Sequence, residues 1–274
     1  MSASPPPAPD DSPPQVIDAA GDAAFRDAAR ATRLDPDHPW IGGYVDYEWR
    51  HLRHILATYG FALRGRRVLE FGANIGASAI VMSHLGAQVQ AVDVSERWLG
   101  LARLNALRHG HMGIGWHTVN ARDGLPFADG AFDLINCNSV LEYVSPADLP
   151  AVRDELDRVL APGGHLLVTG TSSRLWPREV HSGRWLVNYL PRRVDRWIFG
   201  RAVERGLRPW ALRAGRWAAY ENLDAQDGGR RLLAARRAIG ADTPSLRAMV
   251  ALGALLRIGP GLLAHNLSCA LRKR

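Results

Sequence analysis

A glycine-rich turn near residue 70 is the first feature of the sequence that could bind a ligand. An apolar run, 67–71, leads into Gly72-Ala73-Asn74-Ile75-Gly76. Glycines at the end of a strand let the backbone approach a ligand more closely than any β-carbon would allow. A dinucleotide-binding motif, Gly-x-Gly-x-x-Gly, would place its second and third glycines at Asn74 and Ala77. The spacing therefore predicts a ligand site but disfavours a bound pyrophosphate.

Three more segments follow this turn in a fixed order. They are Leu125-Pro126-Phe127-Ala128-Asp129, then Leu141-Glu142-Tyr143-Val144, then Leu160-Ala161-Pro162-Gly163-Gly164. Together with the glycine turn they resemble the motifs of class I methyltransferases that depend on S-adenosylmethionine (SAM). Agreement of four motifs in order and distance is more specific than one glycine turn. The resemblance implies SAM as the cofactor and methyl transfer as the reaction.

The resemblance also implies which residues hold the cofactor. Asp93, 23 residues after Glu70, matches the family's ribose-binding carboxylate, which can accept hydrogen bonds from two adjacent hydroxyls. Many relatives carry an Asp for the adenine amino group four residues before the Leu-Pro-Phe segment, but Ala121 stands there. Asp123 either substitutes for it or only shapes a surface turn. The full predicted cofactor set is Glu70, Gly72, Asn74, Gly76, Asp93, Asp123 and Asn138.

Two candidate catalytic residues, His181 and Glu179, follow the fifth expected strand, where the family commonly places substrate-recognising insertions. An imidazole has a pKa near ~6.5 and can take a proton from a hydroxyl acceptor at neutral pH. The alternative for both residues is a structural role in which they hold the loop together by hydrogen bonds. Tyr143 stands where many relatives have His, which removes one proton acceptor.

Other chemistries find little support. Cys137 and Cys269 are the only cysteines, and both lie in strand-like apolar sequence without metal-ligand spacing. We predict no metal. Cys137 lacks the neighbouring Pro of enzymes that attack pyrimidines with a thiolate, and a strand cysteine is usually inert packing. The Asn/Asp-Pro-Pro-aromatic motif of base-methylating enzymes is also missing, so nucleic acid ranks last among the acceptors.

These residues require an α/β scaffold. From residue 63 onward, short apolar runs alternate with helical patterns, which indicates a parallel sheet covered on both faces. We predict a Rossmann-like, doubly wound, seven-stranded sheet with a reversed last strand. Expected strands are 67–71, 89–94, 116–120, 132–137, 165–169 and 265–273. Expected units are a disordered tail (1–14), a helical N-terminal cap (15–60), a SAM-binding core (61–173), an Arg/Trp-rich helical substrate cap (174–262) and the last strand (263–274).

Charge is segregated along the chain. Residues 1–150 carry 12 Lys and Arg against 17 Asp and Glu, a net of −5, whereas residues 174–274 carry 20 against 7, a net of +13. Eleven arginines and five tryptophans fall within 174–217. Arg forks onto phosphate oxygens, and Trp suits a membrane–water interface. The segment predicts an anionic or lipid-linked acceptor or a peripheral membrane contact. The alternative is a solvated lobe with its own small core.

The sequence thus favours a SAM-dependent methyltransferase that acts, at oxygen, on a small molecule, lipid or glycan precursor. An NAD-dependent oxidoreductase is disfavoured by the missing middle glycine, and a non-catalytic methyltransferase-like assembly subunit by the nearly complete turn with Asp93. The Pro-rich opening does not resemble a signal peptide. The apolar run 248–256 is far shorter than the ~20 residues that span a membrane. We therefore expect a cytoplasmic protein, free or peripheral at the inner membrane surface.

Overall fold

The computed structural model describes residues 12–180, 182–200 and 203–274. Within these residues lies a seven-stranded sheet in the order β3-β2-β1-β4-β5-β7-β6. The strands are β1 (Arg67–Phe71), β2 (Gln88–Asp93), β3 (Gly115–Thr118), β4 (Phe132–Asn138), β5 (Leu160–Ser172), β6 (Glu221–Asn222) and β7 (Asn266–Arg272). β7 runs antiparallel to β5 and β6, and the other pairs are parallel. The predicted sheet with a reversed last strand is confirmed.

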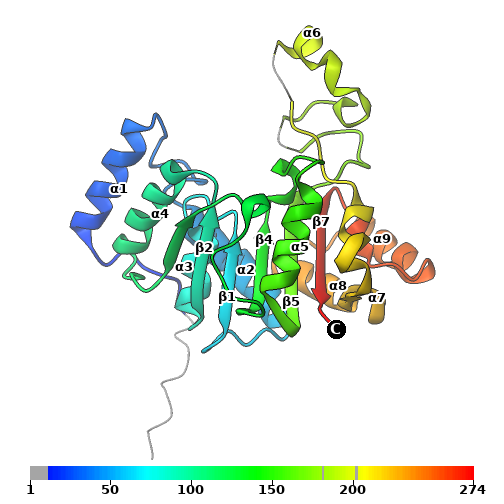
Figure 1. Ribbon diagram of the computed structural model, residues 1–274, viewed down its shortest axis with the longest axis horizontal. Helices are drawn as coiled ribbons and strands as arrows, with labels where there is room; N and C mark the ends of the chain where they lie inside the picture. Colours follow the sequence, from blue (N-terminus) through cyan, green and yellow to red (C-terminus); the bar gives the residue numbers. More distant parts are fainter. Residues whose placement is uncertain (1–11, 181, 201–202) are drawn as a thin grey trace, which may run out of the picture.

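Helices cover both faces of this sheet (Figure 1). In the described residues they are α1 (Ala19–Ala31), α2 (Tyr44–Thr58), α3 (Ala77–His84), α4 (Glu96–Arg108), α5 (Leu149–Val159), α6 (Asp195–Phe199), α7 (Leu223–Gln226), α8 (Arg230–Ala238) and α9 (Pro244–Leu255). Successive side chains of a strand point to opposite faces. Val68 therefore joins the core under α2 and α3, while Leu69 joins the core under α5. Both faces being buried explains the continuous apolar runs of these strands.

The N-terminal stretch predicted to be helical forms α1 and α2. Asp18 caps α1 by accepting a hydrogen bond of 3.0 Å from the backbone N–H of Ala20. α1 packs on α4 at the β3 side of the sheet, and α2 packs on α3 and the sheet (Figure 1). α2 thereby reaches the region above the glycine turn.

The junction between α5 and β5 differs from the prediction. We expected this strand to begin at His165, but β5 already begins at Leu160. Leu160 pairs with Phe132, and the register shifts before His165 pairs with Leu134. The Pro-Gly-Gly residues thus form an irregularity within β5, at which the pairing with β4 is locally interrupted.

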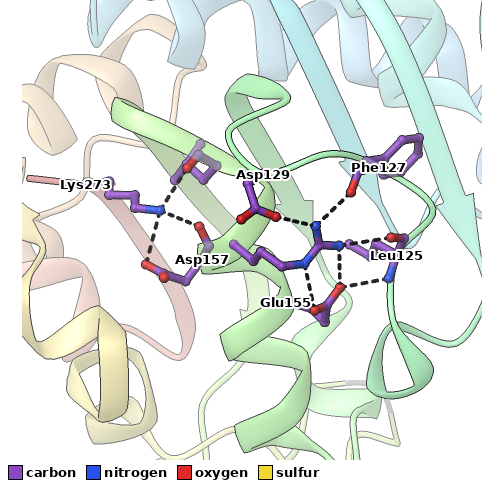
Figure 2. Close-up of polar contacts among 8 residues, drawn as sticks. Leu125, Phe127, Asp129, Glu155, Asp157 and Lys273 are labelled. Atoms are coloured by element: carbon purple, nitrogen blue, oxygen red, sulfur yellow. Dashed lines mark hydrogen bonds and ion pairs between the residues drawn. The ribbon is translucent and has the colours of Figure 1, made fainter.

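Arg158, near the end of α5, holds the segment that precedes β4 (Figure 2). Its guanidinium donates to the carbonyls of Phe127 at 2.8 Å and Leu125 at 3.0 Å, and to the carboxylate of Asp129 at 2.8 Å. Glu155 accepts from the same guanidinium at 2.8 Å and from the backbone N–H of Leu125 at 2.8 Å. The Leu-Pro-Phe-Ala-Asp motif is therefore fixed by its contacts with α5.

Lys273, the only lysine of the chain, closes the end of α5 on the other side (Figure 2). Its Nζ donates to the carbonyl oxygens of Asp157 and, at 2.9 Å, of Leu160. These are acceptors that the end of a helix leaves unpaired, and a cation there also suits the helix dipole.

The described residues between 174 and 205 form an irregular lobe above the carboxyl ends of the parallel strands (Figure 1). Asp195 and Arg205 hold it together through a buried pair with contacts of 2.5 and 2.7 Å. Trp217 is buried against the core, but Trp197 is 87% exposed. No helix in the described part of the chain has the length and apolarity to cross a bilayer. The predicted limits of the N-terminal cap (15–60) and of the substrate cap (174–262) stay predictions.

Candidate active site

Two adjoining hollows open at the carboxyl ends of β1, β2 and β4. The larger hollow has a volume of about 500 Å³ and the smaller about 180 Å³. Phe71 pairs with Val92, so the turn after β1 and the end of β2 meet at one edge. The residues that line both hollows are Gly72, Asp93, Val94, Val140 and Tyr143. The two hollows therefore form one elongated site.

Gly72 has no room for a side chain. Its φ is +80°, and a β-carbon built there would lie 2.2 Å from Cγ2 of Val140. Asn74 also adopts a positive φ, 50°, which Asn tolerates better than most residues. The turn thus brings bare backbone to the edge of the larger hollow, as a closely approaching ligand requires.

Asp93 ties the turn to the end of β2. Its Oδ2 accepts a hydrogen bond of 2.9 Å from the backbone N–H of Asn74, and its Oδ1 accepts one of 2.9 Å from the N–H of Ser95. Each oxygen of a carboxylate has a second lone pair. The carboxylate is therefore held in place by the protein and can still accept hydrogen bonds from a ligand in either hollow.

Two buried carboxyl groups are associated with the larger hollow: Glu70 lines it, and Glu48 contacts the lining residue Asn138. Glu70 accepts a hydrogen bond of 2.7 Å from Asn136, and burial raises its pKa well above the usual range. Glu48, on α2, accepts one of 3.0 Å from Asn138, and burial raises its pKa to about 7. The lining of the larger hollow contains no cationic side chain that could pair with the charged form of either group. A positively charged ligand would therefore relieve the cost of their burial.

The end of β4 carries local strain beside the same hollow. Ser139 has a φ of 54°, and its backbone N–H donates to the carbonyl of Thr169 on β5 at 2.8 Å. Gly170 follows on β5, and a β-carbon there would lie 2.2 Å from Oγ of Ser139. The close approach of the two strands directs the chain from Ser139 through Val140 along the wall of the site. Such outliers concentrate at functional sites.

Comparison with known proteins agrees with this geometry. Residues 69–168 match the family model described as "Methyltransferase domain". These residues form a class I, SAM-dependent methyltransferase domain. It includes β1 to β4, α3 to α5 and most of β5.

The domain resembles curated enzymes over part of their length. The chain is 31% identical to a ubiquinone biosynthesis O-methyltransferase of Aromatoleum aromaticum over 133 residues, which are 47% of this chain and 55% of that enzyme. A protein of the same name from Pseudomonas aeruginosa is 26% identical over 60% of this chain and 67% of its own. The chain spans about half the length of the first of these relatives.

A solved structure shares the fold across most of the chain. The crystal structure of an S-adenosylmethionine-dependent methyltransferase from Mesorhizobium loti covers 82% of this chain and 97% of its own. The TM-score is 0.51 and the identity 21%. The likeness supports the architecture, including the reversed strand, beyond the 69–168 segment.

The predicted cofactor residues divide into three groups within the methyltransferase domain. Glu70, Gly72, Asn74, Asp93 and Asn138 all line the larger hollow. Gly76 lies just outside it, where its φ of +77° opens α3. Asp123 lines neither hollow: it is exposed and lies 3.4 Å from Nε of Arg122.

The predicted catalytic residues are His181 and Glu179, and neither is among the described residues that line the two hollows. His181 falls outside the described residues. Glu179 is buried in the lobe, where Oε2 accepts from the N–H of Ser182 at 2.6 Å and Oε1 accepts from Oγ of Ser172 at 3.3 Å. It lines neither hollow, and its contacts are those of a residue that shapes the loop. A catalytic role for either residue stays a prediction.

Sequence reasoning missed several residues of the site. Glu48 and Ser78 belong to the polar end, and Tyr44 and Trp98 line the larger hollow. Ala121, noted for replacing an Asp, does line the smaller hollow together with Asn120 and Asp148. The sequence could have pointed to Glu48, because it is an acid within the apolar stripe of α2. The other buried residues of that helix are Val45, Trp49, Leu52 and Leu56.

Proposed function

We propose that the protein transfers the methyl group of SAM to a hydroxyl oxygen of a small molecule, lipid or glycan precursor. The main support for this proposal is the elongated site at the ends of β1 and β2, with Asp93 fixed between its two hollows. The lining of the larger hollow contains acids but no Lys, Arg or His. SAM is a cation at its sulfonium and at its ammonium group, so its charge suits this lining.

The chain's residues would divide the work of holding SAM. Glu70 and Glu48 would face the amino-acid end, because an ammonium group would offset the burial of their carboxylates. Asp93 would accept from the ribose hydroxyls, and the smaller hollow would take adenine against Val119 and Ala121. SAM supplies an already activated methyl group, so the protein mainly has to orient the acceptor and exclude water.

Oxygen as the acceptor atom is supported by the names of the curated relatives, which are O-methyltransferases. Tyr143 lines both hollows, but burial raises its pKa to about 12, so the phenol stays protonated at neutral pH and is not available as a base. His181 is the side chain that we propose as the base for a protonated hydroxyl. Cys137 is excluded as a nucleophile because burial raises its pKa well above the usual range.

We also propose an anionic surface or acceptor as the partner of the lobe. Trp185 and Trp197 are exposed there, and Arg192, Arg193 and Arg196 precede Trp197 in the sequence. The carboxylate of Asp195 is already paired with Arg205. A surface of exposed Trp and unneutralised Arg suits anionic lipid headgroups.

Calorimetry with SAM, S-adenosylhomocysteine and NAD tests the cofactor. Binding of the first two without NAD supports the proposal, and NAD binding alone would favour an oxidoreductase. The release of S-adenosylhomocysteine is then measured with a panel of hydroxylated acceptors, which distinguishes an enzyme from a SAM-binding assembly subunit. The subunit would bind SAM and release no product with any acceptor.

A further inference from the structure

A third cavity, of about 620 Å³, lies in the C-terminal part of the fold and shares no lining residue with the two hollows of the methyltransferase domain. Its walls come from α8, α9 and residues 263–266, which lead into β7. The volume lies within the range of roughly 300–1,000 Å³ that small-molecule sites occupy. It is therefore large enough for a ligand of its own.

The walls of this cavity are mainly apolar. Leu232, Met249 and Leu252 line it, and so does Trp176, whose Nε1 donates to the carbonyl of Leu263 at 2.9 Å. That bond fixes the indole against the segment before β7. An apolar cavity with fixed walls favours the burial of hydrocarbon.

α9 is an apolar helix with little of the protein to pack against. Of its twelve residues, Gly253 alone is buried. Leu246, Met249 and Leu252 face the cavity, while Leu255 is 79% exposed. A helix of this composition normally buries a stripe of its side chains. The space under α9 thus holds apolar surface that an occupant would cover.

One cationic group, Arg236 on α8, projects among these apolar side chains. It is half-buried, and the cavity lining contains no Asp or Glu. The nearest acid along the chain, Asp242, is already held by Arg237 at 2.7 Å and Arg247 at 2.8 Å. The described residues form no ion pair with Arg236. A cation partly removed from water without a counter-ion is costly, and a ligand's acidic group would supply that counter-ion.

We propose that this cavity binds an anionic amphiphile, with an apolar chain under α9 and a carboxylate or phosphate group on Arg236. The proposal goes beyond methyl transfer and stands whether or not the domain is active. The cavity is linked to the other site through α8, which carries Arg236 and packs against α2, whose Tyr44 lines the larger hollow. An occupant would therefore sit beside the helix that walls the SAM site.

Calorimetry on the full chain, with decanoate and with decanol, tests the proposal. The two probes share a chain length and differ in charge. We expect wild type to bind decanoate at least about ten times more tightly than decanol, because a charge-assisted hydrogen bond is lost with the alcohol. Arg236→Gln should bind both probes equally, and Arg236→Lys should retain a preference for decanoate. Arg230→Gln, an exposed arginine on the same helix, should behave as wild type.

A second variant keeps the test independent of the charge. Leu252→Gln should weaken both probes about equally, since it removes apolar wall without touching Arg236. Thermal melting of each variant checks that it is folded. The proposal is overturned if wild type fails to bind decanoate, if it binds the two probes equally, or if Arg236→Gln keeps the preference.

Discussion

The backbone N–H of Asn74 donates a hydrogen bond of 2.9 Å to Oδ2 of Asp93, which joins the turn after β1 to the end of β2. Because Oδ1 accepts in the same way from Ser95, one carboxylate anchors two loops. The residue that the sequence assigns to ribose binding is therefore also part of the site's support.

Replacing Asp93 by Ala should weaken SAM binding by about 1–3 kcal/mol, or roughly 5- to 150-fold, because charge-assisted hydrogen bonds to the ligand are lost. Calorimetry measures the change. Asp123→Ala is the matched control, since Asp123 is an exposed acid outside both hollows, and its affinity should equal that of wild type. Equal affinities for wild type and Asp93→Ala would remove Asp93 from the site.

Gly72→Ala should abolish measurable SAM binding and lower the melting temperature. The new β-carbon would meet Val140 at 2.2 Å and would sit at a φ of +80°. Gly60→Ala separates the two causes, because Gly60 has a φ of +74° but a β-carbon at that position would meet no atom within 4 Å. That control should lose only the stability expected of a residue in the left-handed region, about 1–2 kcal/mol. Similar losses in both variants would show that steric contact at Gly72 is unimportant.

Glu48→Gln should become more stable than wild type as pH rises. Burial raises the pKa of Glu48 from 4.5 to about 7, so the folded state binds the proton more tightly than the unfolded state. Wild type therefore loses stability as pH rises from about 4.5 to 7, and the variant lacks this loss. The difference should approach about 3 kcal/mol above pH 7. Urea unfolding at several pH values measures it.

Glu155→Gln provides a control of opposite sign for that experiment. Hydrogen bonds with Arg158 lower the pKa of Glu155 in the folded state. The ionised Glu155 therefore stabilises the folded state at pH values above its pKa in the unfolded chain, and this stabilisation is lost as the pH falls. The variant should be less stable than wild type at neutral pH and should approach it in acid. A pH-independent effect of Glu48→Gln would contradict the assignment of a raised pKa.

Reversal of Arg192 and Arg193 to Glu should reduce sedimentation with vesicles that contain anionic lipid. Wild type should bind vesicles that contain anionic lipid more strongly than neutral vesicles. This binding should fall with added salt, because exposed charges are screened. The matched control reverses Arg64 and Arg66, two exposed arginines before β1, at the opposite end of the strands from the lobe. If wild type stays in the supernatant with both kinds of vesicle at low salt, the lobe has no membrane role.

His181→Ala should lower turnover on the order of 100-fold while SAM affinity and melting temperature stay unchanged, as expected for a general base. The measurement needs an acceptor from the hydroxyl panel. A large fall in melting temperature with little change in turnover would instead favour the structural role for this residue.

The parts of the site that are local in sequence could be predicted. The turn from Glu70 to Gly76 and the acid Asp93 lie directly after their strands, and parallel strands bring their carboxyl ends to one edge. The position of Asp123 could not be derived in this way, because a 3₁₀ turn, Ala121–Asp123, decides which side chain points to solvent.

Glu48 and the C-terminal cavity show what sequence patterns leave undetermined. Glu48 reaches Asn138 across 90 residues, and only the packing of α2 on α3 brings them together. The apolar run 248–256 is equally compatible with a buried helix and with α9, whose side chains border a cavity. Periodicity reports which residues are apolar, but the space left between elements depends on how those elements pack.

The place of β7 between β5 and β6 has a consequence for biosynthesis. β7 follows both β5 and β6 in the chain, yet both of these strands pair with it. While the ribosome still holds residues 266–272, the nascent chain presents β5 as an open edge and leaves β6 without a strand partner. Exposed edges of that kind invite pairing with other chains. The interval before β7 emerges is thus the stage of synthesis at which aggregation competes most directly with folding, and at which a chaperone would have the most to protect.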